Sequence, residues 1–201
     1  MKLIFVGPQG SGKGTQAKRI AKKMGLCHIS MGDLLRDVKG DLKKEVDEIM
    51  EKGRMVSDEI TERLLREKLS GSECENGFIL DGFPRNVGQV EILKSVSDID
   101  KAVEIVISDE ESVRRISGRR TCSKCGAIFN VNSCRPVVEG VCDRCGGELV
   151  QRKDDNEDAL RERLKVYHEE TEKILKFYDV ARVDGEGSIE KVEGEILEIL
   201  K

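Results

Sequence analysis

The sequence predicts an α/β protein in which a parallel five-stranded sheet is covered by helices on both faces. Short apolar runs alternate with longer segments of helical periodicity, and the run at residues 2–6 stops at Gly7, as a buried parallel strand does. Parallel strands need long crossover connections, which the helices supply. The other strands are predicted at 27–29, 78–80, 102–107 and 180–183. Helices are predicted at 13–24, 31–38, 41–52, 58–70, 87–96, 109–117, 155–178 and 188–200.

Two segments depart from this alternation, and we expect each to be an insertion in the core domain. Residues 30–57 carry helical patterns broken by Gly40 and Gly53, which predicts a small helical insertion. Residues 118–153 contain cysteines, small residues and few helix signals, which predicts a second, cysteine-rich insertion. The core domain is then assembled from residues 1–29, 58–117 and 154–201.

Composition excludes several classes of protein. The chain has 201 residues, 38% of them hydrophobic, and a net charge of -4, which argues against non-specific nucleic-acid binding. The longest apolar run, Leu3 to Val6, is too short for a membrane span or for the apolar part of a signal peptide. Seven cysteines without an export signal indicate a reducing compartment, so we expect a cytoplasmic protein whose thiols bind metal or stay free.

The segment from Gly7 to Thr15 follows the first strand and precedes a helix, which is the setting of a phosphate-binding loop. Glycines let consecutive backbone N–H groups turn towards a phosphate chain, and the following helix adds its positive end. Lys13 supplies a full charge to the phosphate oxygens. A flexible glycine turn is the alternative, but the strand–loop–helix context favours a nucleotide site of the P-loop NTPase type.

The way this loop ends, together with motifs in three later parts of the chain, gives a specific resemblance. Gly14 stands between Lys13 and Thr15, and Gln16 follows, so the loop reads G-x-x-G-x-G-K-G-T-Q. The chain therefore resembles adenylate kinases, among the nucleoside monophosphate kinases, from residue 3 to its closing helix. The further motifs that match are Ser30 to Arg36, Asp81-Gly82-Phe83-Pro84-Arg85 with Gln89, Gly118-Arg119-Arg120, Arg152 to Asn156, and Arg163.

The resemblance implies reversible phosphoryl transfer from Mg-ATP to AMP, giving two ADP, by a cytoplasmic monomer without nucleic-acid or membrane partners. It implies that residues 30–57 bind the monophosphate and that residues 118–153 form a mobile lid. Arginine suits such a site because its planar guanidinium grips phosphate oxygens in pairs and stays charged. The residues implied to act in catalysis are Lys13, Arg85, Arg119, Arg152 and Arg163.

The same resemblance assigns the binding residues. Asp81 is expected to hold Mg²⁺ through water, with capping of the next turn as the alternative. Pro84 is expected to follow a cis peptide that aims Arg85. Residues implied to bind ATP are Gly10, Ser11, Gly12, Lys13, Gly14, Thr15, Arg119, Ile128, Phe129 and Gly187. Residues implied to bind AMP are Met31, Arg36, Arg54, Met55, Val56, Gly82, Phe83, Pro84, Arg85, Gln89, Arg152 and Arg163.

One position departs from the family pattern in the acceptor pocket. Adenylate kinases carry a threonine where this chain has Met31, and methionine donates no hydrogen bond to adenine. Gln89, whose amide both donates and accepts, remains in place, so AMP is the expected acceptor. A kinase for another monophosphate is the alternative. A nucleotide-dependent switch or nucleic-acid reader is disfavoured by the charge and by the absence of a guanine-reading N/T-K-x-D motif.

Four cysteines have the spacing of a structural metal site. Cys122-x2-Cys125 and Cys142-x2-Cys145 are separated by sixteen residues, as in four-cysteine zinc sites, and two disulfides are the disfavoured alternative. Zn²⁺ is the expected ion, although another tetrahedral thiolate metal fits the same ligands. The remaining cysteines and histidines are interpreted as structural: Cys134 as a spare thiol, Cys27 and Cys74 as buried small hydrophobes, and His28 and His168 as packed or surface residues.

Overall fold

A computed structural model describes residues 1–201. Its centre is a parallel sheet of five strands in the order β2-β3-β1-β4-β8, which confirms the predicted fold class. The sequence order of the strands is not their spatial order, because each connection crosses over one face through a helix. The strands are β1 (Lys2–Val6), β2 (Cys27–Ser30), β3 (Phe78–Asp81), β4 (Lys101–Val106) and β8 (Val180–Asp184).

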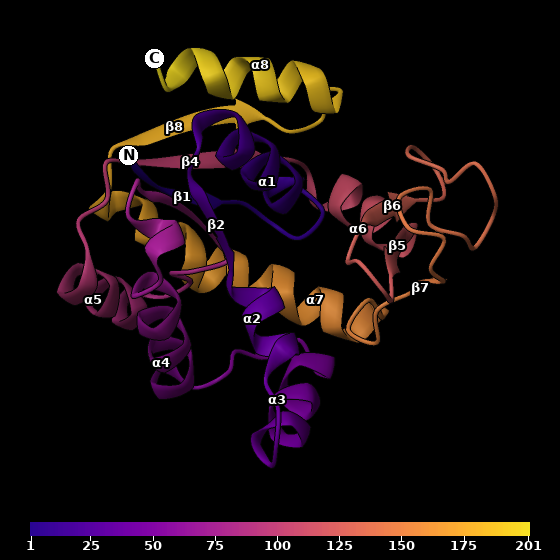
Figure 1. Cartoon of the computed structure of the whole chain (residues 1–201), viewed down its shortest axis with the longest axis horizontal. Helices are drawn as coiled ribbons and strands as arrows, with labels where there is room; N and C mark the ends of the chain where they lie inside the picture. Colours follow the sequence, from indigo (N-terminus) through magenta and orange to yellow (C-terminus); the bar gives the residue numbers. More distant parts are fainter.

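The chain forms eight α-helices, most of which lie around the sheet, whereas α3 projects away from it beyond α2 (Figure 1). Most begin where serine or asparagine side chains accept a backbone N–H of the first turn, as at Ser30, Asn86 and Ser108. The helices are α1 (Lys13–Met24), α2 (Met31–Asp37), α3 (Leu42–Glu51), α4 (Asp58–Leu69), α5 (Val87–Val96), α6 (Asp109–Ser117), α7 (Glu157–Val166) and α8 (Ile189–Ile199).

The alternation of side chains along each strand divides the core into two layers. Leu3 and Phe5 point to the layer covered by α1 and α8, where Ile20 and Ile196 are fully buried. Ile4 and Val6 point to the opposite layer, which packs against residues of α2, α4 and α5. The sheet is therefore buried on both faces, which is why its strands read as continuous apolar runs.

The helix predicted over residues 155–178 is wrong as a single regular element. The α-helix α7 ends at Val166 and is followed by a π-helical turn, η2 (Tyr167–Thr171), and a 3₁₀ segment, η3 (Glu172–Phe177). Two buried side chains of the π-turn are tied to the core, since Tyr167 Oη donates to Glu104 Oε1 at 3.2 Å and Thr171 Oγ1 donates to the Arg85 carbonyl at 2.9 Å. These tertiary bonds favour a local change of helical pitch that apolar periodicity does not reveal.

The cysteine-rich stretch folds as a small antiparallel sheet in the order β6-β5-β7, set apart from the main sheet (Figure 1). Its strands are β5 (Arg119–Cys122), β6 (Ile128–Asn130) and β7 (Leu149–Val150). A few residues, including Phe129 and Leu149, form its separate core. No helix of the chain has the length and apolar character that crossing a membrane requires.

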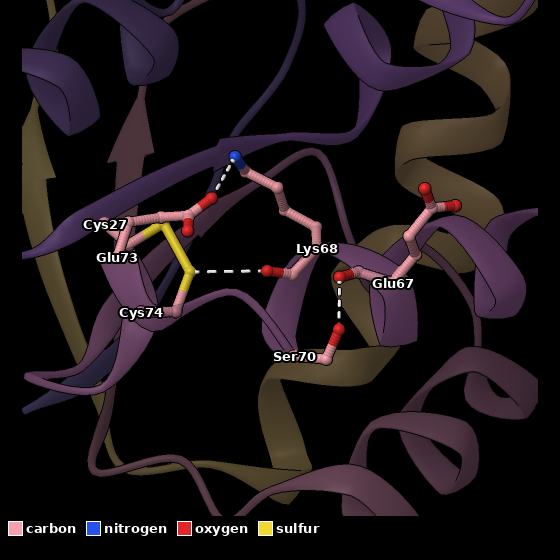
Figure 2. Close-up of a disulfide and its surroundings, with 6 residues drawn as sticks. All are labelled: Cys27, Glu67, Lys68, Ser70, Glu73 and Cys74. Carbon is pink, nitrogen blue, oxygen red and sulfur yellow. Dashed lines mark hydrogen bonds and ion pairs between the residues drawn. A yellow bond between two sulfur atoms is a disulfide. The ribbon is translucent and has the colours of Figure 1, made fainter.

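Cys27 and Cys74 are joined in a disulfide, which corrects the expectation that both thiols stay free (Figure 2). Cys27 opens β2, and Cys74 ends a 3₁₀ turn, η1 (Ser72–Cys74), that precedes β3. The two residues are 47 positions apart, so no local sequence spacing predicts the bond. The pairing of β2 with β3 brings their Cα atoms to a distance of 5.0 Å. Beside the disulfide, Lys68 Nζ pairs with Glu73 Oε1 at 2.7 Å.

Because of this disulfide, we expect the melting temperature of the protein to depend on whether Cys27 and Cys74 are oxidised. A cross-link closing a loop of this length stabilises the fold by about 4 kcal/mol in the chain-entropy model. Because each kcal/mol shifts the melting temperature of a chain of this size by roughly 2–4 °C, the double variant Cys27→Ala/Cys74→Ala should melt about 10 °C below wild type. Thermal melts followed by circular dichroism without reductant measure this. Cys134→Ala, which removes an exposed free thiol, is the control and should melt as wild type. Seven titratable thiols in unreduced, chelator-treated, denatured protein would contradict the bond.

Candidate active site

The carboxyl ends of the central strands meet where the phosphate loop and Asp81 lie side by side. Asp81 ends β3 and is in register with Phe5 on one neighbour and Ser30 on the other. A Cβ atom on Gly14 would lie 2.8 Å from Asp81 Oδ2, so only glycine allows the loop to approach this carboxylate. The offset of the loop motif, with glycine directly after Lys13, therefore has a structural cause.

Several of the donors that the phosphate loop offers to a ligand have few or no partners within the protein. Helix α1 begins at Gly12 with a left-handed backbone and no side-chain cap, so its first N–H groups remain available to an anion. The hydroxyl of Ser11 is buried and has no hydrogen-bond partner. Lys13 Nζ donates only to the Pro8 carbonyl, at 3.1 Å. These orphaned donors fit a phosphate chain seated in the loop.

Helix α6 supports this loop, which sequence reasoning did not anticipate. Ser112, which is fully buried, donates to the Gln9 carbonyl, and Arg115 donates to the carbonyls of Gly10 at 3.2 Å and Gly185 at 2.9 Å. Predicted helix 109–117 is confirmed, but a serine and an arginine in an amphipathic helix give no signal of a distant contact.

A cleft joins the loop to the segment around the D-G-F-P-R motif. The structure brings Lys13, Arg85 and Arg163 together there, and the Phe83–Pro84 peptide at its floor is cis, as the resemblance implies. The side of the cleft formed by the predicted monophosphate segment contributes Met55. The residues lining it include Gly7, Gln9, Gly53, Gly82, Pro84, Tyr167 and Thr171.

Asp154 and Asp155 hold three of the predicted arginines. Both residues are buried, each 5% exposed. Arg163 pairs with Asp154, and Arg36 Nη2 approaches the same carboxylate at 3.4 Å. Arg119 pairs with Asp155 through Nε at 2.8 Å and through Nη2. Burial acts to raise the pKa of Asp154, but Arg163 and Arg36 outweigh it, so the pKa lies below its ordinary value.

Three other cations of the site have no carboxylate within 4 Å. Lys13 donates to a carbonyl, Arg85 Nε donates to the Gly82 carbonyl at 2.8 Å, and Arg152 Nε donates to Thr121 Oγ1 at 3.0 Å. Their pKa values fall because burial disfavours their charge and neighbouring arginines repel it. The pKa of Lys13 is lowered to about 8 and that of Arg152 to about 10, and the pKa of Arg85 is also lowered. The site thus holds uncompensated positive charge that an anion would stabilise.

Asp81 fits the predicted magnesium role. Its Oδ1 is buried and has no hydrogen-bond partner, which suits a carboxylate that contacts an ion through water. His28, which the sequence suggested was isolated, places Nε2 3.9 Å from Asp81 Oδ2 and has no hydrogen-bond partner there. His168 lies on the surface between Asp109 and Glu172, as its structural interpretation predicts.

On the acceptor side, Gln89 is buried and its amide bonds to protein groups. Its Oε1 accepts the Arg85 backbone N–H at 2.8 Å, and its Nε2 donates to Asp58 Oδ1 at 2.9 Å. Met31 is 3% exposed and packs in the apolar layer that also contains Val56 and Phe83. Met31 therefore packs in the hydrophobic core, whether or not it also contacts the base of an acceptor nucleotide.

Arg85 is the most constrained of the site residues. Its N–H donates to Gln89, its guanidinium donates to the Gly82 carbonyl, and its own carbonyl accepts from Thr171 Oγ1 of the π-turn. Thr171, which also lines the cleft, is a candidate site residue that the sequence analysis missed. The irregular helix that positions it could not be inferred from periodicity.

The four predicted metal ligands converge in the small sheet. Their sulfur atoms all lie within 4.8 Å of one another, with Cys122 and Cys145 at 3.5 Å and Cys125 and Cys142 at 3.7 Å. A tetrahedral ion with metal–sulfur bonds of about 2.3 Å separates its sulfurs by about 3.8 Å, so these residues fit such an ion. Cys134 lies outside the cluster as an exposed free thiol.

Beyond the phosphate loop and Arg119, three predicted ATP-binding residues remain, and none of them lines the central cleft. Ile128 is exposed on β6, Phe129 is buried in the core of the small sheet, and Gly187 lies in the turn between β8 and α8. Arg54 is exposed beside the cleft-lining Gly53. Arg161 pairs only with Glu157 on the surface. The assignments of these residues to nucleotides stay predictions.

A phosphate loop at the end of β1, an aspartate at the end of β3 and a cluster of cations around one cleft define a nucleotide-binding phosphotransferase of the P-loop type. The chain belongs to the adenylate kinase family, whose family model matches residues 5–183. It is 42% identical to the adenylate kinase of Thermosipho africanus, with both chains covered completely. It is 45% identical to that of Archaeoglobus fulgidus, over 100% of this chain and 98% of the relative. It is 47% identical to that of Caldicellulosiruptor bescii, over 89% and 86%.

The cysteine cluster predicts a metal-dependent stability. Cys142→Ser removes one buried ligand, so the metal content, measured by plasma mass spectrometry, should fall from one ion per chain to near zero. The melting temperature should fall with it, while turnover at moderate temperature should change far less, because the ligands lie outside the cleft. Cys134→Ser should alter neither quantity. Full metal content and an unchanged melting temperature in Cys142→Ser would show that the cluster is not a structural metal site.

Proposed function

We propose that this protein catalyses reversible transfer of the γ-phosphoryl group of Mg-ATP to AMP, giving two ADP. The observation that carries the proposal is a set of half-buried cations without carboxylate partners: Lys13 and Arg85, which line one cleft beside the phosphate loop, and Arg152 of the cysteine-rich segment. Two nucleotides bring several phosphate charges into one small volume, and only such a site compensates them. The family relationship supports the same reaction.

In this reaction an oxygen of the AMP phosphate forms a bond to the γ-phosphorus, while the bond to the bridging oxygen of ADP breaks. The phosphate loop and Lys13 bind the donor phosphates, and Arg36 and Arg85 hold the acceptor phosphate. Arg119, Arg152 and Arg163 stabilise the charge that develops on the transferring group. Mg²⁺, held through water by Asp81, neutralises the donor oxygens when it is bound.

The arginines paired with Asp154 and Asp155 suggest how residues 118–153 close over the cleft when nucleotides bind. Arg119 belongs to the small sheet, whereas Arg163 and both aspartates belong to or precede α7. Phosphate oxygens compete with these carboxylates for the same guanidinium groups, so ligand binding draws residues 118–153 over the cleft as a lid. Closure excludes water that would otherwise hydrolyse the donor.

The ion in the small sheet is proposed to be Zn²⁺. Four thiolates at tetrahedral spacing suit it, and four protein ligands leave no coordination position for a catalytic water or a substrate. Its role is to fold a lid whose own apolar core is very small.

The lowered pKa of Lys13 predicts how the reaction with Mg-ATP depends on pH. The pKa of Lys13 in the free enzyme is lowered to about 8, and the charged form binds phosphate, so kcat/KM for Mg-ATP should be maximal below pH 8 and fall up to tenfold per pH unit above it. In contrast, kcat should remain constant up to a higher pH than kcat/KM does, because bound phosphates raise the pKa of Lys13 again. Lys13→Arg should not show the decline at pH 8. A kcat/KM level to pH 9.5 in wild type would contradict this role.

The function is tested by initial rates with Mg-ATP and AMP, UMP, CMP or GMP, with products separated by chromatography. AMP should be strongly preferred, with ADP as the only product. Lys13→Met should reduce turnover by at least about 100-fold in folded protein. Lys18→Met, on the exposed side of the same helix, should not. Preference for another acceptor would make Met31 the specificity residue, and no transfer to any monophosphate would refute the proposal.

A further inference from the structure

The amide of Gln89 is held by two groups of opposite hydrogen-bonding character. The Arg85 N–H, 2.8 Å from Oε1, can only donate, and the Asp58 carboxylate, 2.9 Å from Nε2, can only accept. Rotating the amide by half a turn would set donor against donor at Arg85 and acceptor against acceptor at Asp58. Gln89 is 3% exposed, so bulk water cannot replace the lost bonds. The protein therefore fixes one of the two amide orientations.

Gln89 and Asp58 each lie at the start of a helix, where a further hydrogen bond holds the residue in place. Gln89 lies in the first turn of α5, where its own N–H donates to the cap residue Asn86 at 2.8 Å. Asp58 is the first residue of α4, and hydrogen bonding of the Thr61 hydroxyl to the Asp58 carbonyl, at 2.9 Å, ties it to the helix. Two helix starts thus meet at one amide.

With both bonds made, Gln89 keeps one lone pair on Oε1 and one N–H on Nε2. Adenine offers an amino group that donates beside a ring nitrogen that accepts, which complements this pair. A 6-oxopurine has a carbonyl oxygen in place of the amino group, and this oxygen would face Oε1. Only a rotated Gln89 amide could accommodate it, and Asp58 opposes that rotation.

We propose that Asp58 is a specificity-determining residue for the acceptor base and acts by fixing the orientation of Gln89. Asp58 is a positioning residue, since its partner is the glutamine and not the base. The proposal rests on the proposed function, because it takes a purine monophosphate read by Gln89 as the acceptor. Nothing in the sequence pairs the two residues, which are 31 positions apart.

The experiment compares AMP with inosine monophosphate, which differs only at the position facing Gln89 and the adjoining ring nitrogen. The quantity measured is the ratio of kcat/KM for AMP to kcat/KM for inosine monophosphate. Asp58→Ala should reduce this ratio by about tenfold, the contribution of one charge-assisted hydrogen bond, mainly through KM for the monophosphate. Asp58→Asn, whose carbonyl oxygen can still accept from Nε2, should restore most of the ratio. The KM for Mg-ATP should not change.

Glu59→Ala is the matched control, since it removes an exposed carboxylate from the same helical turn and should leave the ratio intact. If Asp58→Ala does not fold, Asp58→Ser keeps a polar group at the start of α4 while losing the reach to Gln89. A wild-type enzyme that prefers AMP and an Asp58→Ala or Asp58→Ser ratio equal to wild type would overturn the inference, as would an equal loss in Glu59→Ala. A wild-type enzyme that does not phosphorylate AMP would instead overturn the proposed function.

Discussion

The ion pairs of Asp154 and Asp155 with Arg36, Arg119 and Arg163 are the interaction on which the rest of the site depends. Guanidinium groups crowded into one site repel one another, and burial together with the repulsion from Arg36 and Arg119 lowers the pKa of Arg152. Two buried carboxylates offset enough of this charge for the cluster to exist without a ligand. They leave Lys13, Arg85 and Arg152 unpaired, so the site is stable yet remains strongly attractive to anions.

The same carboxylates link parts of the chain that are distant in sequence. Arg36 comes from α2, Arg119 opens the small sheet and Arg163 lies in α7, and all three meet at two adjacent residues. The phosphate loop is fastened from another direction by Ser112 and Arg115 of α6, the helix that leads into the small sheet. A movement of the small sheet would therefore be transmitted both to the phosphate loop and to α2.

Most of the fold, the place of the phosphate loop and the clustering of four cysteines could be predicted from the sequence. Continuous apolar strands, the glycine-rich loop and the paired C-x-x-C turns are local patterns, and local patterns can be interpreted without coordinates. The disulfide between Cys27 and Cys74, the contact of Asp58 with Gln89 and the π-turn that positions Thr171 could not be found this way. Each depends on tertiary packing between residues whose spacing in sequence carries no periodic or motif signal.

The disulfide also changes the connectivity of the chain. Residues 28–73, which contain α2, α3 and α4, form a closed covalent ring together with the two cysteines. A single break of the backbone inside this ring leaves the protein one covalent molecule, whereas a break in residues 118–153 divides it into two fragments with no covalent link between them. The two insertions thus differ in topology: residues 30–57 lie inside a covalent ring, whereas residues 118–153 form an open loop whose two ends are joined by the ion pair between Arg119 and Asp155.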